Sequence, residues 1–177
     1  RTDEIVAHAG EVFINRKAAK ELRLDDSKPI VSYLPTFWGA SSIYTTGYEI
    51  LRNLSNDYTL IFRPHPQTPK KHLKKYIKYI KKSDKSIIYA PEGRYQTVEL
   101  TDILNMSSVI IGDLSSVMLD ATLTKKPLIF ASDQSIKMQH NNYRSIKELF
   151  QYSEKVDETT LDINSSIANA IEKGIDD

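Results

Sequence analysis

The stretch "SVIIGDLSSVMLDATLTKKPLIFA" (residues 108–131) decides how this chain folds. It reads as a short apolar strand at 108–112, a Gly–Asp turn, a helix that opens at Ser115 and Ser116, and a second apolar strand at 127–131. Neither apolar run alternates with polar residues, which is typical of strands buried on both faces. This strand–helix–strand order predicts a parallel pair of strands joined by a helical crossover.

The rest of the chain repeats this pattern. Apolar runs without alternation occupy 29–34, 59–63 and 86–90. Helical periodicity is found at about 41–55, 69–82, 97–106, 115–125 and 162–173. The order of these segments predicts an α/β fold, with a Rossmann-like parallel sheet and right-handed crossovers that place helices on both faces. We expect this domain to occupy residues 29–177, preceded by a helical lead-in at 1–28.

Composition narrows the class of protein. The 177 residues suit one domain, and a formal net charge of +1 gives no reason to expect a nucleic-acid partner. The absence of cysteine excludes disulfide scaffolds, thiolate metal sites and cysteine nucleophiles. No apolar run approaches the roughly 20 residues of a membrane span, and no signal peptide is visible. We therefore expect a cytoplasmic domain.

The carboxyl ends of the strands are where ligands bind in such a sheet. The segments "PTFWGASS", "RPHPQTP", "PEGRYQT" and "GDLSSVMLD" follow the first four strands in turn. Hydroxyl, cationic and imidazole groups are concentrated in these segments. Because the ends of parallel strands meet at one edge of the sheet, the pattern predicts a binding cleft there.

The fourth segment has the features of an anion site. Ser115 and Ser116 stand where a serine caps a helix by accepting a bond from a backbone N–H group. The same N–H groups, with the helix dipole behind them, suit a phosphate, and Asp120 would face the cleft about one turn further on. The alternative is a simple helix cap followed by a solvated aspartate.

The second segment holds two functional side chains between prolines. Pro64 and Pro66 restrain Arg63 and His65 to extended conformations. Arginine offers a planar fork of donors that matches phosphate oxygens, and histidine can give or take a proton near neutral pH. The alternative is a turn with a merely polar histidine. Because glycine-rich phosphate loops are absent, classical dinucleotide and P-loop sites have no support.

Taken together, "YLPTF" (33–37), "RPHP" (63–66) and "GDLSSVMLDATLTKKPLIF" (112–130) resemble the CDP-glycerol glycerophosphotransferase family of teichoic-acid primases and polymerases. The resemblance implies the C-terminal, donor-binding half of a GT-B fold, which would act with an N-terminal half that this chain lacks. It also implies transfer of glycerol phosphate, or a related alditol phosphate, from a CDP-activated donor to a lipid-linked or polymer acceptor. Two alternatives stay open: a GT-B glycosyltransferase or epimerase-like domain that uses a UDP-sugar, and a nucleotide-binding module without catalysis.

The resemblance also implies which residues form the site. His65 would be catalytic, as an acid or a base. Contacts with the donor would come from Arg1, Pro35, Thr36, Arg63, Pro64, Asp113, Ser115, Ser116 and Asp120. Trp38 and Leu114 depart from the family, which usually has arginine and an aromatic residue at these positions. The remaining histidines are expected to be structural or surface residues, namely His8, His72 and His140.

No metal-binding cluster is visible, so no tightly bound metal is expected, and Mg²⁺ that enters with the donor diphosphate remains an open alternative. The segment "PKKHLKKYIKYIKKSDK" (69–85) carries eight lysines. Leu73, Tyr76, Ile77 and Ile80 recur at helical spacing and should pack on the sheet, which turns the lysines outward. These lysines form either a solvated face or a basic face that docks on anionic lipid at the inner side of the plasma membrane.

Overall fold

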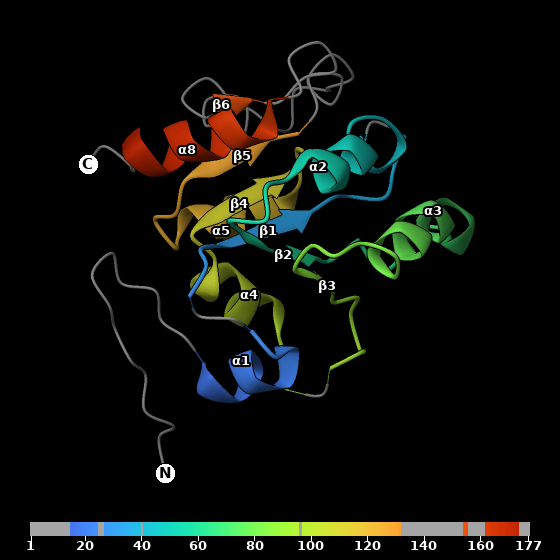
Figure 1. Cartoon of the computed structure of the whole chain (residues 1–177), viewed down its shortest axis with the longest axis horizontal. Coiled ribbons are helices and arrows are strands. Elements are labelled where there is room, and N and C mark those ends of the chain that lie inside the picture. Colours follow the sequence, from blue (N-terminus) through green and yellow to red (C-terminus); the bar gives the residue numbers. More distant parts are fainter. Residues whose placement is uncertain are drawn as a thin grey trace.

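The computed structural model of the chain describes residues 15–24, 27–39, 41–95, 97–131, 154–155 and 162–173. Within these ranges, six parallel strands form one sheet in the order β3-β2-β1-β4-β5-β6 (Figure 1). The strands are β1 (Ile30–Leu34), β2 (Thr59–Phe62), β3 (Ile87–Tyr89), β4 (Val109–Gly112), β5 (Leu128–Phe130) and β6 (Glu154–Lys155). The predicted parallel α/β sheet is confirmed, and β6 is a strand that the sequence pattern did not predict.

The direction of the chain across the sheet reverses between β1 and β4. From β1 the chain moves outward through β2 to β3, and then returns to place β4 on the other side of β1. Val31 of β1 is accordingly paired with Leu60 on one side and Val109 on the other. Adjacent strands whose connections leave in opposite directions form a crevice at their carboxyl ends, which is where ligands bind in open α/β sheets.

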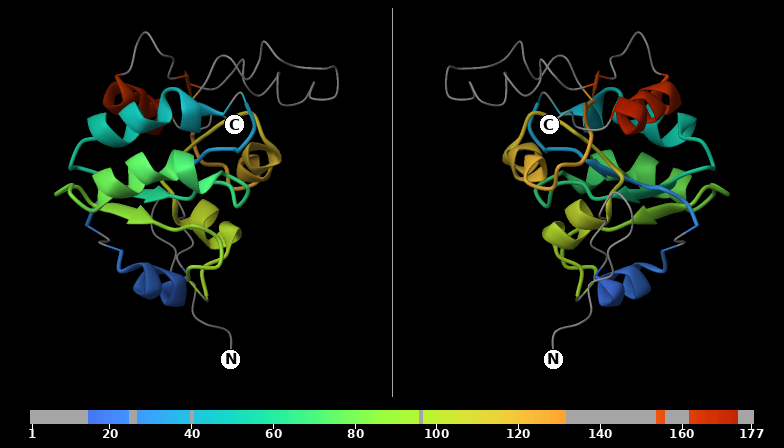
Figure 2. Two further views of the ribbon diagram at one scale, coloured as in Figure 1. Left: turned by 90° about the vertical axis from the view of Figure 1, so that its right-hand side faces the viewer. Right: turned by 90° about the vertical axis from the view of Figure 1, so that its left-hand side faces the viewer.

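Helices cover both faces of the sheet (Figures 1 and 2). One face is covered by the 3₁₀-helix η1 (Ser42–Tyr44), α2 (Gly47–Asn53), α3 (Lys70–Ile80) and α8 (Ile163–Lys173). The other is covered by α1 (Arg16–Leu22), α4 (Leu100–Met106) and α5 (Ser116–Thr122). All residues of β1, β2, β4 and β5 are buried, which explains why the sequence of these strands does not alternate.

The helix predicted at 41–55 is divided into η1 and α2. Gly47 begins α2 where a side chain would not fit, because a Cβ there would overlap Tyr33 Oη and lie 2.8 Å from Ser42 O. Tyr33 also stacks on Phe62, with ring centroids 5.6 Å apart, and its hydroxyl lies 2.7 Å from Ser42 Oγ. The break between the two helices falls at Thr45, whose backbone angles (φ −118°, ψ −102°) are not helical, and the glycine lets α2 begin close to Tyr33.

Helix α1 packs against the same sheet as the rest of the domain. Its residues Ala18 and Leu22 are buried in the core that α4 and α5 complete. Asn15 caps the helix by accepting bonds from two backbone N–H groups, and its Nδ2 donates to Asp102 Oδ1 at 2.9 Å. The helix predicted within residues 1–28 is thus present at 16–22, and its packing joins it to the sheet.

Candidate functional site

A cavity of about 480 Å³ lies at the carboxyl ends of the strands, at the point where the sheet reverses direction. Its walls come from the loops after β1, β2, β3 and β4 and from the first turns of α4 and α5. The lining residues are Leu34, Pro35, Thr36, Phe37, Trp38, Arg63, Pro64, His65, Pro66, Glu92, Glu99, Leu100, Leu114, Ser115, Ser116 and Val117.

Most of the residues predicted for the site meet in this cavity. Seven of the ten line it: Pro35, Thr36, Arg63, Pro64, His65, Ser115 and Ser116. Arg1 lies outside the described residues. Asp113 and Asp120 are described but are not among the lining residues, and Asp120 is exposed to solvent one turn along α5. Contact of these three residues with a donor stays a prediction.

Asp113 is buried beneath the loop that follows β1. Its Oδ2 accepts hydrogen bonds from Thr36 N at 2.8 Å and Ser41 Oγ at 2.9 Å, and its Oδ1 accepts one from Ser42 N at 3.0 Å. Burial raises the pKa of this carboxyl group, and the hydrogen bonds from the loop oppose that rise. Asp113 therefore ties the end of β4 to the loop that forms one wall of the cavity.

The start of α5 differs from the predicted serine cap. Ser115 occupies the N-cap position, but its side chain makes no capping hydrogen bond. Its Oγ is shielded from solvent and has no hydrogen-bond partner, although the residue lines the cavity. The expectation of a capping serine is therefore wrong. A shielded hydroxyl without a partner costs free energy, and such a cost is commonly retained at functional sites.

The loop after β2 is hydrogen-bonded to the end of β1 and to the loop that follows it. Arg63 N donates to Tyr33 O at 3.0 Å, and His65 N donates to Pro35 O at 3.2 Å. The His65 ring stacks on Phe37 with centroids 4.3 Å apart, and its Nδ1 accepts a bond from Gln67 N at 3.1 Å. Because Nδ1 accepts, the neutral ring carries its proton on Nε2.

Positive and negative side chains share the cavity wall. Burial lowers the pKa of the Arg63 guanidinium, and Glu92 and Glu99 oppose this. Burial also lowers the pKa of His65, against the influence of Glu92. An arginine keeps its proton at neutral pH even so, whereas the histidine pKa falls below its ordinary 6.5. The wall therefore offers one cation, one neutral imidazole and two carboxylates.

Sequence reasoning missed four side chains of the lining that bear on chemistry: Phe37, Trp38, Glu92 and Glu99. Glu92 lies in the "PEGRYQT" segment, so its position after a strand was the available signal. Glu99 begins α4 as its N-cap, in a capping box with Asp102, and only the fold brings it to the cavity.

His72 is half-buried and lies edge-on to Tyr44 with centroids 4.8 Å apart, which is a structural contact. His8 and His140 lie outside the described residues.

Within the described ranges, no three histidine or carboxylate side chains come together as metal ligands. None of the helices described there is long and apolar enough to cross a bilayer.

A parallel sheet with a cavity at its switch point defines a Rossmann-like domain of the kind that forms one half of a GT-B fold. The particular family follows from the sequence. The chain belongs to the CDP-glycerol:poly(glycerophosphate) glycerophosphotransferase family, whose sequence profile matches residues 1–170. The suspected family resemblance is therefore confirmed.

Individual relatives agree with this family. The chain is 26% identical over 145 residues to the teichoic acid poly(ribitol-phosphate) polymerase of Bacillus spizizenii (strain ATCC 23059 / NRRL B-14472 / W23). That match covers 75% of this chain and 21% of the relative, so the chain spans about a fifth of the length of that polymerase.

Two solved structures share the fold. A variant of the wall teichoic acid polymerase TagF, soaked with CDPG, aligns with a TM-score of 0.57 at 18% identity, over 92% of this chain and 41% of TagF. The C-terminal CMP-Kdo binding domain of WaaA from Acinetobacter baumannii aligns with a TM-score of 0.56 at 12% identity, over 89% of this chain and 87% of that domain.

Proposed function

We propose that this chain is the donor-binding part of a transferase that moves glycerol phosphate, or a related alditol phosphate, from a CDP-activated donor. The observation that supports this most directly is the cavity at the switch point, where Arg63, His65 and Ser115 share one lining. Membership of the glycerophosphotransferase family supports the choice of donor. The CMP-Kdo bound by the WaaA domain of similar fold is also a cytidine nucleotide.

The chemical character of the wall suits such a donor. A guanidinium fork binds phosphate oxygens, so Arg63 would hold the diphosphate. Carboxylates accept hydrogen bonds from hydroxyl groups, and Glu92 and Glu99 are placed to receive those of a ribose or an alditol. A volume of about 480 Å³ is within the usual range for small-molecule sites.

The reaction would be a phosphoryl transfer. An acceptor hydroxyl oxygen bonds to the β-phosphorus while the bond from that phosphorus to the bridging oxygen breaks. CMP leaves with the electron pair, and the hydroxyl proton is lost to a base. Charge on the phosphate oxygens rises, so the site would act mainly by positioning and electrostatic stabilisation.

His65 is better arranged to donate a hydrogen bond than to accept a proton. With Nδ1 engaged by Gln67 N, the free Nε2 of the neutral ring carries hydrogen and can donate to a phosphate or bridging oxygen. The base would then come from elsewhere. We infer that it comes from the other half of the GT-B fold, and that this half also holds the lipid-linked or polymer acceptor.

Metal ions would play a secondary part. Among the described residues no group of three or more histidine or carboxylate side chains comes together as metal ligands at the cavity. We therefore expect any Mg²⁺ to be held by the donor's own phosphate oxygens, with the protein supplying Arg63 as the permanent positive charge.

Calorimetric titration of the chain with CDP-glycerol, CDP-ribitol, CMP and UDP-GlcNAc tests the proposal. We expect a CDP-alditol to bind more tightly than CMP, and UDP-GlcNAc to bind weakly. Binding to UDP-GlcNAc alone would instead identify a GT-B glycosyltransferase or epimerase-like domain. If the protein that contains both halves binds CDP-glycerol but transfers nothing, the domain is a non-catalytic nucleotide-binding module.

A further inference from the structure

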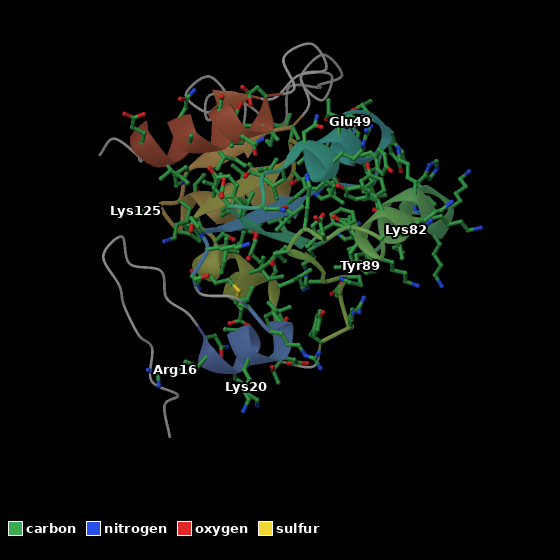
Figure 3. The ribbon with its side chains drawn as sticks, in the orientation of Figure 1. Arg16, Lys20, Glu49, Lys82, Tyr89 and Lys125 are labelled. Atoms are coloured by element: carbon green, nitrogen blue, oxygen red, sulfur yellow. The ribbon has the colours of Figure 1, made fainter. Side chains whose placement is uncertain are left out.

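Helix α3 and the two residues after it carry a row of lysines, which we call the lysine stripe. It consists of Lys70, Lys71, Lys74, Lys75, Lys78, Lys81 and Lys82. All seven residues are exposed, and the nitrogen-tipped side chains around Lys82 extend away from the sheet in Figure 3. At 100° per residue these positions fall within an arc of about 140°, along about 18 Å of helix.

The opposite face of α3 packs in the hydrophobic core. Leu73 and Tyr76 are buried against the sheet, with Ile77 and Ile80 packed beside them. Tyr76 Oη donates to Ile43 O at 2.7 Å, which fixes the rotation of the helix. The lysine stripe is therefore held in a constant direction by the fold.

The stripe has no internal counter-charge among the described residues. No carboxylate there lies within ion-pair distance of its lysines, and α3 contains no acidic residue. Lys75 is the one member whose side chain has a described contact, over the rings of Tyr48 and Tyr76 at 5.1 and 5.3 Å. Lys85, by contrast, donates to the backbone oxygens of Arg52 and Leu54 and is outside the stripe. Seven adjacent like charges repel one another, so a polyanion that binds them gains favourable electrostatic energy.

The stripe begins beside the cavity. Lys70 follows His65 by five residues, and Thr68 N donates to His65 O at 2.9 Å. His72, in the first turn of α3, contacts Tyr44, whose hydroxyl donates to Phe37 O at 2.6 Å. Since Phe37 and His65 both line the cavity, the start of α3 is joined directly to the cavity wall.

We propose that the lysine stripe binds the phosphodiester backbone of a poly(alditol phosphate) chain, the polymer acceptor, as it runs toward the cavity. The choice of partner rests on the proposed function, because a transferase of this kind lengthens a polymer with one negative charge per unit. A lipid bilayer is a less suitable partner for the lysine stripe than this polymer. Helices that dock in a membrane insert an apolar face, and that face of α3 is occupied by the core.

The test is binding of lipid-free, fluorescently labelled poly(glycerol phosphate) of defined length to the chain, measured by anisotropy at two salt concentrations. The variant Lys74→Gln/Lys78→Gln/Lys81→Gln should bind at least about tenfold more weakly, with a shallower salt dependence. The control variant Lys17→Gln/Lys20→Gln/Lys125→Gln removes the same charge from exposed positions elsewhere, and should stay within about twofold of the wild type.

Three results would overturn the proposal: no polymer binding by the wild type, equal losses in both variants, or stripe-dependent binding to phosphatidylglycerol vesicles without polymer binding. The last result would make the stripe a membrane face. Titration of both variants with CDP-glycerol separates this inference from the proposed function, and it should give unchanged affinity. If CDP-glycerol binds and the polymer does not, only the stripe proposal fails. If the polymer binds through the stripe and CDP-glycerol does not, only the donor assignment fails.

Discussion

Arg63 and Asp113 occupy equivalent places in the chain but opposite places in the structure. Each is the first residue after a strand that flanks β1, namely β2 and β4. Arg63 is half-buried and lines the cavity, whereas Asp113 is 0% exposed and lies beneath the loop after β1. A charged residue at a strand end can therefore serve the ligand site or build the scaffold around it.

The neighbouring backbone decides between these two roles. The loop after β1 leaves Thr36 N and Ser42 N without other described partners, and Asp113 accepts from both. No described residue gives Arg63 a comparable internal partner: the two acidic residues that act on its pKa, Glu92 and Glu99, are exposed on the cavity wall. The comparison predicts a large effect on folding for Asp113 and a large effect on ligand binding for Arg63.

Removal of the Asp113 carboxylate should have the largest effect on stability. Asp113→Ala leaves Thr36 N and Ser42 N of the loop after β1 without an acceptor, and should lower the free energy of unfolding by about 3–5 kcal/mol. Urea denaturation measures this. Asp120→Ala, an exposed aspartate on α5, is the control and should change stability by less than about 0.5 kcal/mol. Equal changes of stability in Asp113→Ala and Asp120→Ala would contradict a scaffold role for Asp113.

Removal of the Arg63 guanidinium should affect ligand binding instead. Arg63→Ala should weaken CDP-glycerol binding by about 10- to 100-fold, because hydrogen bonds to a charged phosphate are lost. The free energy of unfolding should change by less than about 1 kcal/mol. Arg94→Ala is the control, since Arg94 is exposed, packs on Tyr89 and Tyr95 and does not line the cavity. Calorimetry that finds Arg63→Ala and Arg94→Ala alike would contradict the assignment.

The Ser115 hydroxyl should behave unlike a helix cap. Because its Oγ makes no capping bond, Ser115→Ala should leave the free energy of unfolding unchanged or raise it by up to about 1 kcal/mol. Asn15→Ala, which removes the true cap of α1, should cost about 0.5–2 kcal/mol. A loss of donor affinity in Ser115→Ala without loss of stability would mark the hydroxyl as part of the ligand site. A stability loss equal to that of Asn15→Ala would show that it caps α5.

The smallest expected effect is a pH dependence that comes from His65. Because burial lowers the pKa of its imidazole below 6.5, the folded chain binds fewer protons than the unfolded chain as pH falls through that value. The stability due to His65 is therefore fully present above pH 6.5 and is lost as the pH decreases below it. Unfolding free energies of wild type and His65→Asn, compared between pH 5 and pH 7.5 at about half-unit steps, should diverge in this direction. Parallel curves would mean that the ring titrates normally.

Much of the site could be inferred from residue order, because parallel strands bring their carboxyl ends to one edge. This is why Thr36, Arg63 and Ser115 reach one cavity although they are far apart in sequence. The direction of each side chain could not be inferred. Asp113, whose contact with a donor stays a prediction, accepts hydrogen bonds from the loop after β1, and Glu99 reaches the cavity only because α4 packs beside the sheet.

The sequence by itself determined the parallel α/β fold and the family, because buried strands, amphipathic helices and three ordered motifs are local patterns. Only the tertiary structure decided which strand-end charges face a ligand and which direction the lysine stripe faces. The physical reason is that a side chain turns toward whatever unsatisfied donors, acceptors or apolar surface the neighbouring segments present. Those segments come together only when the chain folds.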